Sequence, residues 1–431
     1  MKMTVFGPIG GEVTPPASKS ELHRLLIAAA LCYGEPTVIE GCTMSEDIAA
    51  TAQVLQAAGA QVSFSQDEGT VTVAGLLPQG NASFRAPVEP VEACCGESGS
   101  TLRFLVPIFC ALELPGAFSG HGRLPQRPMT PLTSQMQRHG ALFTGESLPF
   151  TVTGRLESGV YTFPGDVSSQ YITGLLFALP LVEGSSEICL TSPLQSRGYV
   201  DLTLDVLRRF GVVVKAQENR FLIAGGQKYT SPKRLLAQGD WSNGAFWLTA
   251  GAMGFPVAVA GLKKESLQGD REICAILRRM GAQFTWKNGR IHPEGGSLTA
   301  TEIDAGQIPD LIPILAVAAA TAKGTTRIVN AGRLRIKESD RLAAMAECLT
   351  RIGAQVEEGA DSLTIYGVPL LKGGEVSSYN DHRIAMAMAI AALKCQEPVI
   401  IHQPMCVAKS YPNFYEEYKR MGGNANVVHM G

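Results

Sequence analysis

The chain has 431 residues, of which 45% are hydrophobic and 18% charged, and its formal net charge is −2 at pH 7. This length exceeds what one hydrophobic core usually supports, so we expect at least two domains. The near-neutral charge argues against binding to nucleic acid or to an anionic membrane, and the first apolar run, Leu25 to Cys32, is too short to span a bilayer and lacks a signal-peptide pattern.

One type of helix ending recurs six times along the chain. The first copy is Leu55-Gln-Ala-Ala-Gly59 and the last is Tyr418-Lys-Arg-Met-Gly422, and the copies recur at intervals of roughly seventy to eighty residues. Glycine tolerates a left-handed backbone, so each copy predicts a helix that ends at the glycine and turns into a strand. The six glycines are Gly59, Gly140, Gly211, Gly281, Gly353 and Gly422.

Each repeat also contains a second helical segment that is richer in alanine and apolar on nearly every side. Such helices should be buried, whereas the helices that end in glycine should lie amphipathic at the surface. Six units fit a fold of two groups of three better than a long solenoid, with the join near Gln238-Gly239-Asp240. The buried helices are expected to start near Lys19, Ser100, Gln170, Asn243, Pro309 and Arg383.

Polar residues gather at the starts of these buried helices. A helix start exposes unpaired N–H groups and the positive end of the helix dipole, so several starts together would form an anion site. Serines at these positions are equally well explained as N-caps. Cations in a first helical turn oppose the dipole, and we expect an anion to offset them. The cations concerned are Lys19, Arg24, Arg103 and Arg383.

Further basic residues precede other expected helix starts. Arg127 stands before Pro128, which we expect to begin a helix, and Arg333 to Arg341 and the segment around Lys409 have the same character. An ordinary charged surface helix is the alternative for Arg333 to Arg341. Arginine suits bidentate binding of phosphate or carboxylate. The nearby carboxylates are Asp310, Glu338 and Asp381.

Several other chemistries lack their motifs. The sequence contains no G-x-x-x-x-G-K-[ST], no G-x-G-x-x-G, no H-E-x-x-H and no G-x-S-x-G. The ten cysteines are scattered without a C-x-x-C pair, which favours reduced thiols and a cytoplasmic protein. We therefore expect no metal and no cofactor, and a cationic site that moves a group between multiply charged anions.

Four motifs in this order resemble the enolpyruvyl transferases, and specifically the 5-enolpyruvylshikimate-3-phosphate synthase family. They are Ser18-Lys-Ser20, Ser168-Ser-Gln170, Lys337-Glu-Ser-Asp-Arg341 and Asn380-Asp-His-Arg383. The resemblance runs from Lys19 to Pro412. It implies an α/β fold of two similar domains, each with three βαβαββ repeats around buried parallel helices (an inside-out α/β barrel). Residues 1–16 with 238–431 would form domain I and 17–237 domain II, with the active site in the cleft between them.

The resemblance implies transfer of the enolpyruvyl group of phosphoenolpyruvate to the 5-hydroxyl of shikimate 3-phosphate, with release of phosphate from a tetrahedral intermediate. Asp310 would accept the hydroxyl proton, Glu338 would donate a proton to C3, and Lys19 would assist. The residues implied for shikimate 3-phosphate are Lys19, Ser20, Arg24, Ser168, Ser169, Gln170, Ser196, Asp310 and Lys337. Those implied for phosphoenolpyruvate are Lys19, Gly99, Arg127, Gln170, Arg341, Arg383 and Lys409.

Some positions depart from the usual family pattern, and the roles of Glu97, Arg197, Arg333 and Arg335 stay open. Because Gly99 has no side chain, we expect glyphosate to compete with phosphoenolpyruvate. We expect a monomer that binds neither nucleic acid nor membranes. A UDP-N-acetylglucosamine enolpyruvyl transferase is the alternative within the fold, although the loop from residue 123 to 130 has no cysteine. A non-catalytic anion-binding protein is the alternative from another class.

Overall fold

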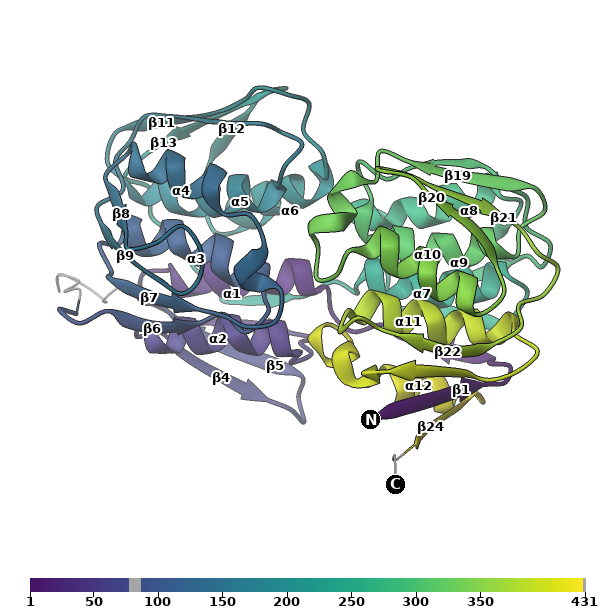
Figure 1. Ribbon diagram of the computed structural model, residues 1–431. Coiled ribbons are helices and arrows are strands. Elements are labelled where there is room, and N and C mark those ends of the chain that lie inside the picture. Colours follow the sequence, from purple (N-terminus) through teal and green to yellow (C-terminus); the bar gives the residue numbers. More distant parts are fainter. Residues whose placement is uncertain (77–86, 429–431) are drawn as a thin grey trace. The chain divides into compact units, whose positions relative to one another are not determined.

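The computed structural model describes residues 1–76 and 87–428, and the chain divides into two compact units (Figure 1). Unit 1 comprises Met1–Ser18 and Gln238–Gly431, and unit 2 comprises Lys19–Ala237. Where the chain leaves unit 1 and returns to it, the two passes pair, because the Ser18 N–H donates to the Gln238 carbonyl at 2.7 Å. Ala17 and Ser18 therefore lie in unit 1, two residues beyond the limit expected from the sequence.

The strands within the described residues form six four-stranded sheets, three in each unit, and each sheet has one parallel and two antiparallel pairs. The sheets of unit 2 have the orders β14-β3-β5-β4, β6-β7-β9-β8 and β10-β11-β13-β12. Their strands are β3 (Thr37–Glu40), β4 (Gln61–Ser65), β5 (Thr70–Ala74), β6 (Val91–Cys94), β7 (Gly116–Ser119), β8 (Ala141–Phe143), β9 (Phe150–Gly154), β10 (Val160–Phe163), β11 (Ser185–Leu190), β12 (Val214–Ala216), β13 (Arg220–Ala224) and β14 (Arg234–Leu236).

Two of the three sheets of unit 1 are completed by the first strands of the chain. The orders of the three sheets are β22-β23-β1-β24, β16-β17-β15-β2 and β18-β19-β21-β20, so that β1 and β2 pair with strands far along the sequence. The strands are β1 (Lys2–Phe6), β2 (Gly11–Val13), β15 (Val257–Ala260), β16 (Gln283–Lys287), β17 (Arg290–Glu294), β18 (Glu302–Asp304), β19 (Thr325–Val329), β20 (Gln355–Glu358), β21 (Leu363–Tyr366), β22 (Gly374–Ser377), β23 (Val399–His402) and β24 (Asn424–Val428).

Six helices have nearly all their side chains buried, as the alanine-rich segments predict. They are α1 (Lys19–Ala30), α3 (Gly99–Ala111), α5 (Ser169–Ala178), α7 (Trp241–Ala252), α9 (Ile312–Ala320) and α11 (His382–Ala391). Within unit 2, the strands lie around α1, α3 and α5 (Figure 1). In α7 and α9 every residue is buried. The predicted α/β fold of repeats around buried helices is thus confirmed.

The other six helices bury one face only and end at the repeated glycines. They are α2 (Glu46–Ala57), α4 (Thr130–Gln137), α6 (Arg197–Arg209), α8 (Ile273–Arg279), α10 (Arg341–Arg351) and α12 (Phe414–Arg420). All six predicted glycines have a positive φ, from 80° at Gly211 to 108° at Gly59. A residue with an L side chain is strained at such positive φ values. The repeated glycines are therefore explained by the left-handed backbone that the sequence predicts at these helix ends.

In the part of the chain that the structure describes, no helix combines the length and apolar character needed to pass through a bilayer. All ten cysteines are free thiols. Among the same residues, no group of histidine, cysteine and acidic side chains is arranged to hold a metal ion.

The buried helices α3 and α5 approach each other closely at a glycine. A Cβ atom built on Gly174 would lie 2.1 Å from the carbonyl oxygen of Arg103, a backbone atom that cannot move without its helix. We predict that Gly174→Ala destabilises the protein by about 2 kcal/mol through overpacking, measured by urea denaturation. Gly145→Ala is the control, because its nearest neighbour would be 3.7 Å away. Equal stability of the two variants would contradict the packing described.

Candidate active site

In unit 1, Arg341, the first residue of α10, pairs with three carboxylates. Its Nη1 donates to Asp310 at 2.7 Å and its Nη2 to Glu338 at 2.8 Å. Its Nε and Nη2 both donate to Asp381, at 2.8 and 3.2 Å. Four of the five guanidinium N–H groups are therefore bound to three carboxylates. The side chain is 1% exposed, so these carboxylates replace the water it has lost.

Asp381 holds this group together from the N-cap of α11. It is fully buried, accepts a hydrogen bond from the Arg383 N–H at 2.9 Å and receives a second from the Ser339 hydroxyl at 3.0 Å. Burial acts to lower the pKa of Arg341, but the charges of Asp381, Glu338 and Asp310 outweigh it and hold that pKa well above its ordinary value. The arginine is thus permanently charged and fixed in place.

Lys337 completes the set, with its Nζ 3.4 Å from Asp310. Burial lowers the pKa of Lys337 below its ordinary 10.5; Asp310 opposes this shift, while the charges of Arg341 and Arg333 add to it. We call Asp310, Lys337, Glu338, Arg341 and Asp381 the carboxylate cluster.

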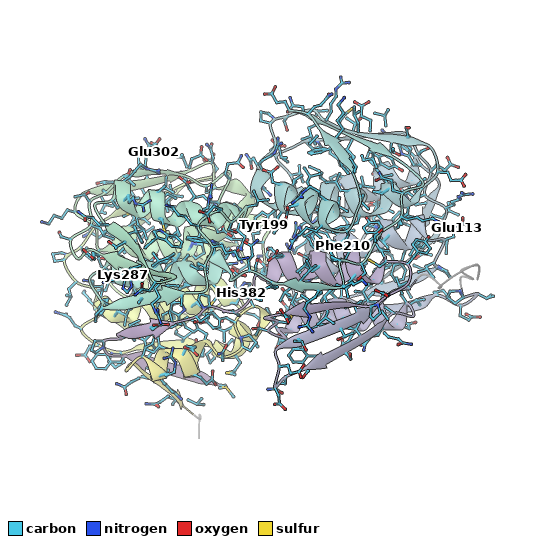
Figure 2. The ribbon with its side chains drawn as sticks, turned by 180° about the vertical axis from the view of Figure 1, so that it is seen from behind. Glu113, Tyr199, Phe210, Lys287, Glu302 and His382 are labelled. Carbon is cyan, nitrogen blue, oxygen red and sulfur yellow. The ribbon has the colours of Figure 1, made fainter. Side chains whose placement is uncertain are left out.

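The remaining predicted residues of unit 1 lie beside the start of α11. His382, the first residue of this helix, is labelled in Figure 2. Arg383 follows it and is 5% exposed. Lys409 donates from Nζ to the carbonyl of Asn380 at 2.6 Å, which ties it to the turn before the same helix. The segment Asn380 to Arg383 therefore carries one cation, Arg383, and the carboxylate that fixes Arg341, and Lys409 binds to it from outside.

In unit 2, Lys19 is the first residue of α1 and pairs with an acid on the neighbouring helix. Its Nζ donates to Asp47 on α2 at 2.7 Å, and the two side chains are 15% and 12% exposed. The negative end of this pair offsets the unfavourable position of the lysine at a helix start. The pair also holds the ammonium group at one point beside the first turn of α1.

Arg24 joins three helices of unit 2. Its Nε donates to Thr203 on α6 at 2.8 Å, and its Nη2 donates to the carbonyl of Tyr199 at 3.0 Å and, at 3.4 Å, to Thr173 on α5. Its Nη1 donates to the Ser20 carbonyl on α1 at 2.6 Å. Tyr199 is labelled in Figure 2. The acceptors of the Arg24 hydrogen bonds are all neutral, and burial lowers the pKa of Arg24 from its ordinary value to about 9.

The four predicted phosphate-binding serines stand at the starts of the helices that Arg24 joins. Ser20 lies in the first turn of α1, Ser168 caps α5 and Ser169 follows it, and Ser196 precedes α6. Helix α6 packs against both α1 and α5. Ser196 is 1% exposed and has φ +56°, an uncommon conformation for a residue with a side chain. The structure thus brings the three helices together through Arg24.

Gly99 stands among cations at the start of α3. A Cβ built on it would lie 2.5 Å from Arg103 Nη1 and 2.8 Å from Arg127 Nη1. Arg103 donates to the Gln170 side chain at 2.8 Å, and Gln170 donates to Ser100 at 3.0 Å. We call Gly99, Arg103, Arg127 and Gln170 the glycine cluster; the absence of a side chain at Gly99 leaves room beside the two guanidinium groups.

Three expectations about local structure were wrong. Arg24 and Arg103 lie in the second helical turn, not the first, because α1 starts at Lys19 and α3 at Gly99. Pro128 does not begin a helix; α4 starts at Thr130, with its proline at the next position. In the basic segments of unit 1, only Arg341 stands at the start of an α-helix, and Lys409 stands at the end of a 3₁₀ helix.

The segment around residues 333–341 begins with the 3₁₀ helix η5 (Gly332–Ile336), and only Arg341 belongs to α10. Lys409 ends the 3₁₀ helix η7 (Pro404–Lys409) rather than starting a helix. The physical reason is that these short segments are fixed by side-chain contacts, such as that of Arg335 with the Gly359 and Ala360 carbonyls, rather than by helix caps.

Sequence reasoning gave no role to Asp47 and left Arg103 and Asp381 without an assigned partner. Asp47 lies in the first turn of α2, where an acid ordinarily matches the helix dipole, so no local signal marks it as the partner of Lys19. Of the residues whose roles stay open, Glu97 lies 3.7 Å from His121 Nδ1. Arg197 binds Asp201 one turn along α6.

The predicted site residues therefore fall into two sets, one in each unit. Unit 1 holds the carboxylate cluster with Arg383 and Lys409, and unit 2 holds Lys19, Arg24, the serines and the glycine cluster. Each set has cations fixed at or near helix starts. Such an arrangement suits the binding of small molecules with several negative charges.

Comparison with known proteins shows the family to which the chain belongs. Residues 4–418 match the profile of the family described as EPSP synthase (3-phosphoshikimate 1-carboxyvinyltransferase). The 3-phosphoshikimate 1-carboxyvinyltransferases of Clostridium novyi (strain NT) and Clostridium kluyveri are each 43% identical to the chain; the first match covers 98% of both proteins and the second 100% of both.

Solved structures extend the likeness to the fold. EPSP synthase from Acinetobacter baumannii matches with a TM-score of 0.81 at 28% identity, over 99% of this chain and 100% of that chain. The enolpyruvyl transferase NikO from Streptomyces tendae matches with a TM-score of 0.79 at 19% identity, over 100% and 99%, which shows the fold alone. The family match, the relatives and the fold together show that the chain is an enolpyruvyl transferase. Within that class, the chain belongs to the EPSP synthase family.

The carboxylate cluster predicts the effect of removing one charge. Asp381→Asn keeps the shape of the side chain but leaves the buried Arg341 with one fewer anion. We predict a loss of about 3 kcal/mol in the free energy of unfolding, measured by urea denaturation. Asp304→Asn, on an exposed aspartate, is the control and should cost less than about 1 kcal/mol. If both variants were equally stable, Asp381 would not hold the cluster.

Proposed function

We propose that the protein transfers the enolpyruvyl group of phosphoenolpyruvate to the 5-hydroxyl of shikimate 3-phosphate and releases phosphate. The relatives named above support this, since 3-phosphoshikimate 1-carboxyvinyltransferase is the name that they and the family carry. In the structure, the proposal rests on the carboxylate cluster, where carboxylates that can accept protons surround the fixed cation Arg341.

Arg341 binds phosphoenolpyruvate in this proposal by exchanging partners. Four of its five N–H groups are already bound to carboxylates. Asp310 and Glu338 are each 18% exposed, whereas Asp381 is fully buried and caps α11. An incoming anion therefore displaces Asp310 or Glu338 more readily than Asp381. The displaced carboxylate gains freedom to accept or carry a proton, which joins substrate binding to catalysis.

Shikimate 3-phosphate binds, in this proposal, at the helix starts that Arg24 joins. The phosphate meets Ser20, Ser168, Ser169 and Ser196, where N–H groups and hydroxyls are available as donors. The ring hydroxyls meet Asp310 and Lys337. Most donors of Arg24 are bound to residues of unit 2. We therefore propose that Arg24 acts near the ring by holding the three helices in place.

The proton transfers follow from the same side chains. Asp310 accepts the proton of the 5-hydroxyl as its oxygen attacks C2 of phosphoenolpyruvate, and Glu338 delivers a proton to C3. The Glu338 carboxylate accepts a hydrogen bond from Arg341. It must therefore gain a proton and release this hydrogen bond before it can donate the proton to C3. Lys19, fixed by Asp47, meets both substrates and assists the loss of phosphate. The glycine cluster, with Arg383 and Lys409, holds phosphoenolpyruvate.

Domain closure, oligomeric state, cellular location and cofactor requirement complete the proposal. We propose that unit 1 and unit 2 act as two domains that close over the substrates and exclude water from the intermediate. We further propose that the protein acts as a monomer in the cytoplasm, in keeping with its ten free thiols, and needs no metal or cofactor.

Phosphate release tests the proposal and its alternatives. Purified protein with shikimate 3-phosphate and phosphoenolpyruvate together should release phosphate, and neither compound alone should do so. Release with UDP-N-acetylglucosamine in place of shikimate 3-phosphate would favour the alternative within the fold. No release with either acceptor would favour a non-catalytic anion-binding protein. The names of the relatives support the first outcome.

Glyphosate inhibition tests the glycine cluster. A methyl group at position 99 would press on Arg103 and Arg127, at 2.5 and 2.8 Å, and take space from an anion bound there. We predict that Gly99→Ala raises the glyphosate concentration for half-inhibition by about tenfold or more, the factor that corresponds to roughly 1.4 kcal/mol of lost binding. Gly145→Ala should leave the inhibition curve of the wild type unchanged. An unshifted curve for Gly99→Ala would refute the placement of the inhibitor.

The pH dependence tests Lys337. Burial lowers the pKa of its ammonium group, so the charge is lost on the alkaline side at a pH below 10.5. We predict that kcat/KM for shikimate 3-phosphate falls as the pH rises towards that lowered pKa, because only the protonated form attracts the substrate. In Lys337→Arg the decline should move to higher pH, since arginine stays charged. Lys287→Arg, on an exposed lysine, is the control, and an identical alkaline limb in all three proteins would contradict the assignment.

A further inference from the structure

Helix α2 supplies none of the proposed binding residues, yet it contacts the start of α1 through two polar pairs. Lys19 pairs with Asp47 at 2.7 Å, and His23 Nδ1 lies 2.7 Å from the Thr51 hydroxyl. Both helices contribute residues four positions apart, which lie on one helix face. The two pairs therefore form successive rungs between α1 and α2, one turn apart.

The second rung continues into α3. The Thr51 and Thr101 hydroxyl oxygens are 2.6 Å apart, and the Thr101 hydroxyl donates to Ser98 Oγ at 2.7 Å. Ser98 is the N-cap of α3 and accepts from the Thr101 N–H at 3.2 Å. His23, Thr51, Thr101 and Ser98 are each at most 2% exposed. We call these four residues the hydroxyl chain.

The donors of the hydroxyl chain run in one direction. Since the Thr101 hydroxyl donates to Ser98, its oxygen accepts from the Thr51 hydroxyl, and the Thr51 oxygen then accepts from His23 Nδ1–H. Each link thus uses the single proton of one group, and none can be replaced by an apolar side chain without leaving a buried partner unsatisfied. Such chains fix the relative position of the elements that carry them.

The hydrogen bonds of the hydroxyl chain and those of Arg24 connect α1 to different helices, although the Arg24 guanidinium also lies over the ring of Phe104 on α3. Arg24 joins α1 to α5 and α6, where the proposed phosphate-binding serines of the shikimate site stand. The hydroxyl chain joins α1 to the cap of α3, one residue before Gly99. One end of the hydroxyl chain, His23, lies one helical turn after Lys19, and the other end, Ser98, lies next to the glycine cluster. Lys19 and the glycine cluster both belong to the proposed phosphoenolpyruvate site.

We propose that His23, Thr51, Thr101 and Ser98 are positioning residues that fix Gly99 relative to Lys19 and so determine the binding of phosphoenolpyruvate rather than of shikimate 3-phosphate. This inference rests on the proposed function. The central residue is Thr51, because its hydroxyl is the only group of α2 in the hydroxyl chain. Valine has nearly the shape of threonine and removes only the hydroxyl.

Steady-state kinetics of four variants test the inference. Thr51→Val should raise KM for phosphoenolpyruvate by about tenfold, the effect of one broken buried hydrogen bond, and leave KM for shikimate 3-phosphate within about twofold. Thr101→Val should give the same split, and it keeps the test available if Thr51→Val does not fold. Thr51→Ser retains the hydroxyl and should restore the wild-type KM. Thr37→Val is the matched control, since the buried Thr37 loses a hydroxyl bonded to Ser231 instead.

Thermal melts separate positioning from stability. Thr51→Val and Thr37→Val each remove one buried hydroxyl and should lose a similar few degrees, so a rise in KM confined to Thr51→Val and Thr101→Val supports the inference. Unchanged KM values in both, or equal rises for the two substrates, would overturn it. A wild-type protein without substrate-dependent phosphate release contradicts the proposed function before any variant is compared, whereas an active wild type with unaffected variants contradicts only the role of the hydroxyl chain.

Discussion

The capture of Arg341 by three carboxylates is the interaction on which the site in unit 1 depends. A guanidinium that is 1% exposed has lost its water, and only close anions make that burial tolerable. Asp381 supplies the permanent contact, since it is fully buried and caps α11. Asp310 and Glu338 are more exposed and supply contacts that can be exchanged. The same pairing therefore fixes the cation and holds beside it the two carboxylates to which we assign the proton transfers.

The repeated architecture explains why such groups meet at all. Every repeat places a buried helix against a four-stranded sheet, and the start of that helix presents N–H donors and, in several repeats, a cation. In unit 2 the cations are again held by the protein: Lys19 by Asp47, and Arg24 by hydroxyl and carbonyl oxygens of three helices. Charges that are fixed before a ligand arrives need little rearrangement to bind it, which is the main source of electrostatic catalysis.

Much of the fold could be predicted from the sequence because its signals are local. The six glycines require a left-handed backbone, and the alanine-rich helices are apolar on all sides, so both were found from the residues alone. The ion pairs could not be predicted, because Lys19 and Asp47, or Arg341 and Asp381, are far apart in sequence and each acid has an ordinary local explanation as a cap or first-turn residue. The expectation that misplaced cations await an external anion was incomplete for the same reason: the protein supplies part of the counter-charge itself.

In the proposed reaction, Arg341 keeps Asp381 and exchanges a more exposed carboxylate for the substrate anion. A crystal structure with shikimate 3-phosphate and glyphosate bound tests this directly. We expect the contacts of Arg341 with Asp381 to remain and a ligand oxygen to replace Asp310 or Glu338 on the guanidinium. Arg341 still bound to all three carboxylates, with the ligand anion held elsewhere, would contradict this exchange.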